Sequence, residues 1–236
     1  MYQQQGEYEK AVNEYEKILL AENPDDIGIH HNLSRYYLRL GRTEEAERER
    51  KIVQRLRKIS DAIEAAQRKV RENPDDLHGY TELAKIYAEN NQPEKAFEIY
   101  KTLLQKDLHV MKAYDGIATL YIRHNQNEKA IDVYETAVKV EPEYANGHLM
   151  LGLLYRQHGQ PQKSTEHLQI ARKLAQSLVE KTPTAENLDM LASVYYAMKE
   201  YVQAEEILQK AIELAPDNEE IQNHLNQVRQ LKKRED

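Results

Sequence analysis

The chain has 236 residues, a net charge of −7 and 31% charged side chains. It has no cysteine, which excludes disulfides, thiol nucleophiles and thiolate metal sites. The negative charge argues against nucleic acid as a partner, because phosphate binding requires a basic surface. No apolar run approaches the ~20 residues that a membrane-spanning helix needs, so we expect no membrane insertion. The sequence does not identify the compartment, and a cytoplasmic location is our expectation.

The first predicted element is an amphipathic helix that begins at Gly6, continues through Tyr15 and Ile18, and ends before Pro24. We expect residues 1–5 to be the last turn of an earlier helix whose body is missing. Region 1–26 would then be a partial repeat made mostly of a second helix. An array that starts in the middle of a repeat leaves apolar surface uncovered, so we expect this chain to be a fragment of a longer protein.

Five later windows repeat one pattern, and they begin at Ile27, Leu77, Met111, Ala145 and Ala185. The intervals from 77 to 111 and from 111 to 145 are both 34 residues. Each window opens with a bulky, an aliphatic and a small residue, and then a tyrosine: Tyr37, Tyr87, Tyr121, Tyr155 or Tyr195. The spacing places these side chains on one face of a helix. The small residue lets a second helix approach closely.

A turn residue suited to the left-handed backbone conformation follows each first helix: Gly41, Asn91, Asn125 and Gly159, with Lys199 as the exception. A second helix then begins, with a small residue near its start. In the window from Ile27 the closing proline comes 16 residues late, and in the window from Ala145 it comes 7 residues late. We therefore predict two extended second helices, of which one is very long and spans about 43–73.

The long predicted helix carries an apolar seam with alternating spacings of four and three residues, which is a coiled-coil period: Ile52, Leu56, Ile59, Ile63, Ala66 and Val70. The seam could pack on the neighbouring repeats, or it could pair with a second copy or a partner. A break at Ser60 is an alternative to one continuous helix, because Asp61 and Glu64 could cap a new helix. Near the C-terminus, an apolar stripe from Ile221 predicts a capping helix, followed by a charged tail over residues 232–236.

These columns resemble the tetratricopeptide repeat family. The chain departs from the family pattern in having no tryptophan, in Leu108 at a closing proline position, and in Arg50 where an aromatic residue is usual. The resemblance implies an all-α, right-handed superhelical solenoid of antiparallel helix pairs. We divide this one predicted domain into regions 1–26, 27–76, 77–110, 111–144, 145–184, 185–218 and 219–236.

No catalytic motif is present: the sequence lacks GxGxxG, GxxxxGK[ST], HExxH and a nucleophile elbow. Nine histidines are scattered without an i, i+4 pair, and His30 and His148 occupy the bulky packing column. We therefore predict no enzyme activity, no cofactor and no metal site.

The resemblance instead implies a concave groove lined by the first helices, which holds a peptide segment. By helical phase, the predicted groove residues are His31, Arg35, Arg39, His78, Thr81, Lys85, Lys112, Asp115, Thr119, Ile122, Arg123, Asn146, Leu149, Leu153, Arg156, Asp189 and Tyr196, with Leu38, Glu186 and Ser193 beside them. Arg35 and Lys85 fit the family's two-carboxylate clamp for chaperone C-termini, but Thr81 does not, so we expect no chaperone adaptor.

The predicted function is a non-catalytic scaffold for protein–protein interaction whose partner is a protein or peptide, acidic or amphipathic in character. Two alternatives stay open. The long helix could form a homodimer, or the array could be the regulatory or recruiting part of a larger enzyme.

Overall fold

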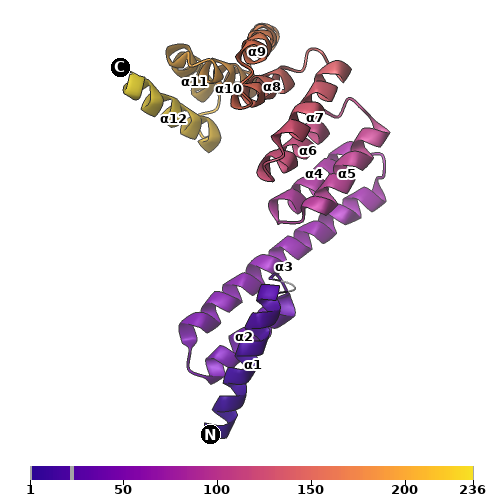
Figure 1. The fold of residues 1–236 in the computed structure, drawn as a ribbon, viewed down its shortest axis with the longest axis vertical. Helices are drawn as coiled ribbons and strands as arrows, with labels where there is room; N and C mark the ends of the chain where they lie inside the picture. Colours follow the sequence, from indigo (N-terminus) through magenta and orange to yellow (C-terminus); the bar gives the residue numbers. More distant parts are fainter. Residues whose placement is uncertain (1, 22–23, 236) are drawn as a thin grey trace. The chain divides into compact units, whose positions relative to one another are not determined.

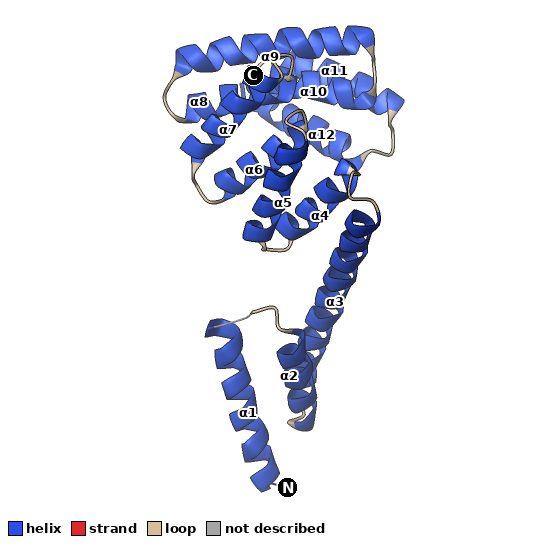
Figure 2. Ribbon diagram, turned by 90° about the vertical axis from the view of Figure 1, so that its right-hand side faces the viewer, coloured by secondary structure: helices blue, strands red, loops and turns tan. Residues whose placement is uncertain are grey.

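The computed structural model describes residues 2–21 and 24–235, and within these ranges the regular structure is helical throughout (Figures 1 and 2). The helices in chain order are α1 (Tyr2–Ala21), α2 (Ile27–Arg39), α3 (Thr43–Glu72), α4 (Leu77–Glu89), α5 (Pro93–Lys106), α6 (Met111–Arg123), α7 (Asn127–Val140), α8 (Ala145–Gln157), α9 (Pro161–Lys181), α10 (Ala185–Ala197), α11 (Tyr201–Leu214) and α12 (Glu219–Glu235). They form two compact units, of which the first ends at Gln92 and the second begins at Pro93.

The first unit is built around the antiparallel pair of α2 and α3. Val12 of α1, Leu33 and Tyr37 of α2, and Ala46 of α3 form its buried cluster, and each is at most 4% exposed. The C-terminal half of α3 packs against α4, where the Gln67 amide donates to the Tyr87 hydroxyl at 2.9 Å. The two ends of α3 therefore support two different first-type helices.

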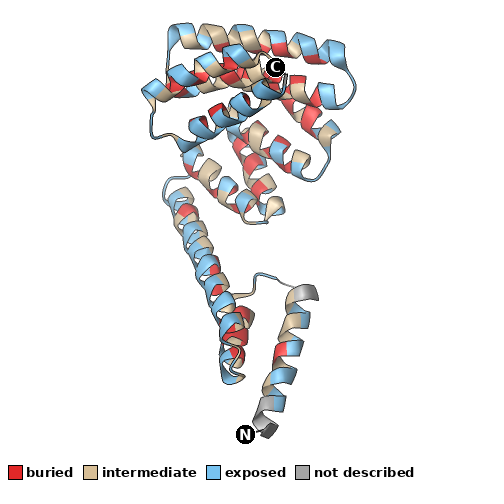
Figure 3. Ribbon diagram, turned by 90° about the vertical axis from the view of Figure 1, so that its left-hand side faces the viewer, coloured by how far each residue is buried: buried red, intermediate tan, exposed pale blue. Residues whose placement is uncertain are grey.

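The second unit alternates first and second helices from α5 to α12. The pairs α6 with α7, α8 with α9, and α10 with α11 pack closely, and α12 covers α11. Each junction between pairs contains a buried cluster, and the three clusters are centred on Tyr134, on Leu168 and on Leu208. Buried residues lie on the sides of the helices that face one another (Figure 3). The fold is thus an all-helical array of antiparallel helix pairs.

The turn between the two helices of a repeat has a left-handed residue at each predicted position. The φ angles are 76° at Gly41, 54° at Asn91, 56° at Asn125, 68° at Gly159 and 64° at Lys199. The predicted conformation is confirmed at the two glycines and the two asparagines. Lys199 adopts it as well, although neither glycine nor asparagine is present there to reduce its cost.

The small residue of each first helix lies where two helices cross at close range. At Gly152, a β-carbon would stand 2.6 Å from Leu168 Cγ and 3.2 Å from the Ser164 carbonyl oxygen. The Ser164 hydroxyl donates to the Gly152 carbonyl at 2.7 Å, and the Ser34 hydroxyl donates to the Ala46 carbonyl at 3.0 Å. Close packing of the two backbones therefore explains the small residue in this column.

Four of the five column tyrosines connect a first helix to the preceding second helix through the phenol hydroxyl. Tyr37 donates to Glu16, Tyr87 accepts from Gln67, Tyr155 donates to Glu135 and Tyr195 accepts from Gln176. In the fifth, the Tyr121 ring meets Phe97 edge to face at 5.7 Å between centroids. An aromatic ring that ends in a hydroxyl fills the junction and also satisfies a polar group there, which explains why tyrosine recurs.

The predicted very long helix is confirmed, because α3 runs without a break from Thr43 to Glu72 over 30 residues, which excludes the alternative of a break at Ser60. Two expectations about helix limits are wrong. First, α1 is one helix from Tyr2, so residues 2–5 are not the end of a separate element, and Gly6 lies inside the helix. Second, the expected charged tail is helical up to Glu235, and the Lys232 ammonium lies 2.9 Å from the Glu205 carboxylate of α11.

The apolar seam of α3 is used largely inside its own unit. Leu56 and Ala66 are buried, and Ile52, Ile59, Ile63 and Val70 are half-buried. Ile59 and Ile63 also line a hollow of about 550 Å³ along the middle of the helix. In the described part of the chain, no helix is both long enough and apolar enough to cross a membrane.

Candidate functional site

In the second unit, side-chain contacts connect each first-type helix to the next one. The Asn146 amide of α8 donates to the Asp115 carboxylate of α6 at 2.9 Å. The Arg156 guanidinium of α8 donates to the carbonyl of Ala197, the last residue of α10, at 2.6 Å. These contacts hold α6, α8 and α10 side by side, and we call the surface that these helices line together with α12 the inner face.

α12 extends the inner face by two more contacts. Its His224 Nδ1 lies 2.8 Å from the Asp189 carboxylate of α10, and its Gln227 amide donates to the Tyr196 hydroxyl at 3.1 Å. From its sequence, this helix was predicted only to cap the array. The apolar stripe at Ile221, Leu225 and Val228 could have placed His224 and Gln227 toward α10, since all three apolar residues are buried.

The Asp115 carboxylate is the centre of a polar cluster. Burial raises its pKa, while hydrogen bonds from Tyr144, Asn146 and Tyr134 act in the opposite direction. Burial, together with the charge of Asp115, raises the pKa of the Tyr134 and Tyr144 phenols well above the usual value, so both stay protonated and serve as donors. This arrangement satisfies a half-buried carboxylate and fixes the spacing of α6 and α8.

Several predicted groove residues are therefore occupied in holding the face together. Asp115, Asn146, Arg156, Asp189 and Tyr196 all contact the neighbouring helix. The expectation that Leu149 lines the groove is wrong. It is 5% exposed and packs in one cluster with residues of α9 and α10, because α10 covers it.

The remaining predicted residues of the inner face are accessible. Lys112, Thr119, Arg123 and Glu186 are exposed, and Ile122, Leu153 and Ser193 are half-buried. The surface is thus basic along α6, apolar in the middle and acidic at the start of α10. A hollow of about 400 Å³ adjoins it, between Asn146, Glu186 and the extended end of α9 at Leu178, which is 40% exposed.

The predicted groove residues of the first unit lie on α2 and α4. On α2, His31, Arg35 and Arg39 are exposed. On α4, His78 and Lys85 are exposed, and Lys85 lies 3.7 Å from Glu89 one turn later. The Thr81 hydroxyl is half-buried and donates to the Leu77 carbonyl of its own helix at 2.9 Å. Thr81 is therefore less available to a ligand than the sequence suggested.

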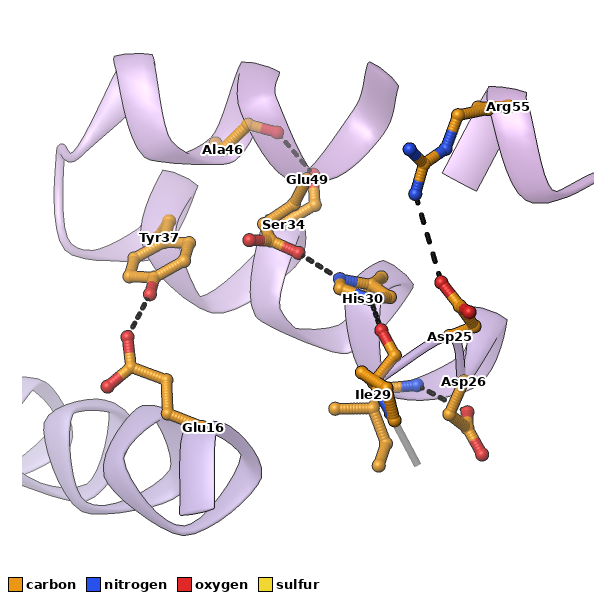
Figure 4. Close-up of polar contacts among 11 residues, drawn as sticks. Glu16, Asp25, Asp26, Ile29, His30, Ser34, Tyr37, Ala46, Glu49 and Arg55 are labelled. Atoms are coloured by element: carbon orange, nitrogen blue, oxygen red, sulfur yellow. Dashed lines mark hydrogen bonds and ion pairs between the residues drawn. The ribbon is translucent and has the colours of Figure 1, made fainter. Parts of the chain in front are cut away.

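The buried histidines of the bulky column are packing residues with polar partners. His30 Nδ1 lies 2.5 Å from the Glu49 carboxylate of α3 (Figure 4). His148 Nδ1 lies 3.0 Å from His167 Nδ1 of α9. Burial lowers the pKa of both His148 and His167, and their proximity lowers that of His167 further. Within residues 2–21 and 24–235, no group of three or more acidic or histidine side chains is placed to hold a metal ion.

Comparison with known proteins points to one repeat family over most of the chain. Models described as "Tetratricopeptide repeat" match residues 2–49, 52–107 and 143–217, and one described as "TPR repeat" matches residues 119–159. No curated protein sequence matches the chain.

Solved structures resemble the chain in fold. TTC0263, a thermophilic TPR protein of Thermus thermophilus, is 23% identical, with 86% of this chain and 98% of that chain covered and a TM-score of 0.51. A chain of the APC/C hetero-tetramer Cut9–Hcn1 is 18% identical, with 97% and 41% covered and a TM-score of 0.51. A tetratricopeptide repeat protein of Parabacteroides merdae is 18% identical, with 96% and 79% covered and a TM-score of 0.46.

Proposed function

The chain belongs to the tetratricopeptide repeat family, and from this premise we propose that it is a non-catalytic scaffold that binds a peptide segment of another protein across its inner face. Peptide binding in such arrays takes place on the surface lined by the first helices. In this chain that surface is formed by α6, α8 and α10, with α12 at its end.

The observation that carries the proposal is the set of contacts between successive first helices. The pairs Asp115–Asn146, Arg156–Ala197 and Asp189–His224 fix the spacing of these helices before any ligand binds. A preformed surface binds an extended peptide with a smaller entropic cost than a surface that must order itself. The structural use of these residues therefore supports the proposal, although it removes them from the set of direct contacts.

The charges of the accessible residues define the ligand further. Lys112 and Arg123 make the α6 end basic, Leu153 provides apolar surface in the middle, and Glu186 makes the α10 end acidic. A matching peptide has carboxylates over α6, one or two apolar side chains near α8, and a basic residue over α10. Such complementarity fixes the direction in which the peptide lies and contributes to selectivity.

Peptide selection followed by charge reversal tests this proposal. Phage-displayed random peptides are selected on the whole chain, and the dissociation constants of the selected peptides are measured by fluorescence anisotropy. Lys112→Glu should weaken binding about fivefold or more, because it replaces attraction by repulsion at one end of the ligand. Lys139→Glu, on the exposed side of α7, is the matched control and should have no effect. Equal effects of the two variants, or no effect of Lys112→Glu, would refute the proposal.

A further inference from the structure

In the second unit, each first helix and the second helix that follows it are covered by the next first helix. α10 covers Leu149 of α8 and Ala175 of α9, which are 5% and 0% exposed. It also accepts a hydrogen bond at Tyr195 from the Gln176 amide of α9 at 3.0 Å. These contacts define what a covered helix pair looks like in this protein.

The contact between Gln176 and Tyr195 has a close counterpart in the first unit, where Gln67 of α3 donates to Tyr87 of α4 at 2.9 Å. Ala66 is 2% exposed beside Gln67, as Ala175 is buried beside Gln176. α4 therefore packs on the C-terminal half of α3 in the way that α10 packs on α9.

The difference between α3 and α9 is their length, 30 residues against 21. The hydroxyl of Ser34 meets Ala46 near the start of α3, as Ser164 meets Gly152 near the start of α9, so the N-terminal halves also correspond. The nine extra residues thus lie between the two packing regions. At about 100° per residue, nine residues make about two and a half turns. The surface of α3 that packs on α4 therefore points about half a turn away from the corresponding direction in α9, and it lies about 13 Å further along the helix axis. α4 consequently does not cover the N-terminal half of α3 or the adjoining side of α2.

We call this uncovered surface the open face. In the repeat, α2 corresponds to α8 and α3 corresponds to α9, and the residues of the open face take the positions that are covered or lie on the inner face in α8 and α9. These residues are His31, Arg35 and Leu38 of α2, and Arg50, Arg57 and Lys58 of α3. All six are exposed, and Leu38 is 40% exposed. His31 stands where Leu149 is buried, and Arg50 and Arg57 stand where Leu168 and Ala175 are buried. Cations thus stand in α2 and α3 at positions that are apolar in α8 and α9, on the surface that α4 does not cover.

The cations of the open face are available to a partner. In the part of the chain that the structure describes, no ion pair involves Arg35, Arg57 or Lys58, and Arg50 has only an exposed contact of 3.8 Å with Glu47. Residues 27–58 contain nine Lys and Arg against four Glu, within a chain of net charge −7. A local basic surface on an acidic protein attracts an acidic ligand selectively.

We propose that the open face binds an acidic amphipathic helix of a partner protein, which lies where the first helix of a further repeat would otherwise pack. Its apolar side chains cover Leu38, and its carboxylates meet Arg35, Arg50 and Arg57. This helix is a second ligand, because the open face belongs to the first unit and the inner face described above belongs to the second. The groove of a helix pair is suited to a helical ligand, which it contacts through apolar residues spaced three and four apart.

A synthetic helical peptide tests the proposal directly. The probe is an 18-residue fluorescein-labelled peptide of Ala, Leu and Glu, with two leucines four residues apart and glutamates on both flanks, and its control has every Glu replaced by Lys. The whole chain should bind the Glu peptide and not the Lys peptide, and binding should weaken several-fold between 50 and 300 mM NaCl because exposed charges are screened. The double variant Arg50→Glu, Arg57→Glu should weaken binding at least tenfold.

Two controls distinguish this site from other basic surfaces. Arg68→Glu changes an exposed cation of the same helix outside the open face and should leave binding unchanged. Lys112→Glu changes the inner face and should also leave binding of this peptide unchanged. The two proposals can therefore fail independently of each other. Leu38→Ser should weaken binding at constant charge.

The proposal is overturned if Arg68→Glu weakens binding as much as the open-face variant, or if the Lys peptide binds equally well. It is also overturned if light scattering shows a dimer that the double variant dissociates. In that case a second copy of the chain, and not a partner helix, occupies the face.

Discussion

Substitution of Gly152 by alanine tests the close packing of α8 on α9, because two effects of known size oppose each other there. Alanine is favoured over glycine inside a helix by about 1 kcal/mol. Its β-carbon would, however, stand 2.6 Å from Leu168 Cγ, 2.7 Å from Leu168 Cδ2 and 3.2 Å from a backbone oxygen. The contact on the backbone side cannot be relieved by a rotamer change, so overpacking should cost about 2–3 kcal/mol. We expect a net destabilisation of about 1–2 kcal/mol.

Calorimetry of the whole chain should show this as a decrease of roughly 3–8 °C in the melting temperature of the transition that includes α8 and α9. Hydrogen exchange in these two helices identifies that transition. Gly6→Ala is the matched control, because a β-carbon at Gly6 meets nothing within 4 Å, and it should stabilise α1 by about 1 kcal/mol. In the double variant Gly152→Ala, Leu168→Ala, the second change should cost less than it does alone. A Gly152→Ala variant that is more stable than the parent chain would refute the packing argument.

Three further changes follow from the same structure. Burial lowers the pKa of His148 and His167, so on acidification the unfolded state binds protons at a higher pH than the folded state does. The melting temperature of the second unit should therefore decrease as the pH falls below about 6.5. The variant His167→Glu gives His148 a carboxylate partner and should make that decrease smaller. Lys199→Gly removes a left-handed lysine at φ 64° and should raise stability by about 0.5–1 kcal/mol in denaturant titration. Glu205→Gln removes the carboxylate that lies 2.8 Å from Arg229, and should speed hydrogen exchange in the last turns of α12; unchanged exchange would exclude this ion pair as the anchor.

The features that sequence alone predicted are those determined locally. The left-handed turn residues follow from the need to reverse the chain between two helices, and even the exception, Lys199, adopts the same conformation as Asn125. The first helices α2, α4, α6, α8 and α10 begin at the residues where the aligned windows begin. The tyrosine column was visible in the sequence, but its hydrogen bonds to the preceding second helix were not.

The features that escaped prediction depend on residues distant in the sequence. Arg156 is bound to the carbonyl of Ala197, 41 residues away, and no local pattern shows this pairing. Leu149 has the helical phase of a groove residue, yet the position of α10 buries it. Gly6 was taken for a helix start because residues 6–11 match the start of a second helix of the repeat, whereas α1 continues through it.

Charge patterns were the least reliable guide to the candidate site. Asp115 and Asp189 were expected to face a ligand, but each has a partner on the neighbouring helix of the inner face. The basic residues of α3 are visible in the sequence, but their surroundings are not. In the structure, Arg50, Arg57 and Lys58 are exposed, although the corresponding positions of α9 are covered by the next first helix, α10. This difference depends on the length of α3.

Photo-crosslinking of a bound peptide tests the central claim, that the inner face is the peptide-binding surface, most directly. A photoreactive phenylalanine is placed at Thr119 of α6, at Ser193 of α10, or at the exposed Thr136 of α7 as the control, and each chain is irradiated with a phage-selected peptide. We predict crosslinks from positions 119 and 193, toward opposite ends of the peptide, and none from position 136. Crosslinks from position 136 that equal those from the inner face, or crosslinks from position 136 alone, would contradict the claim.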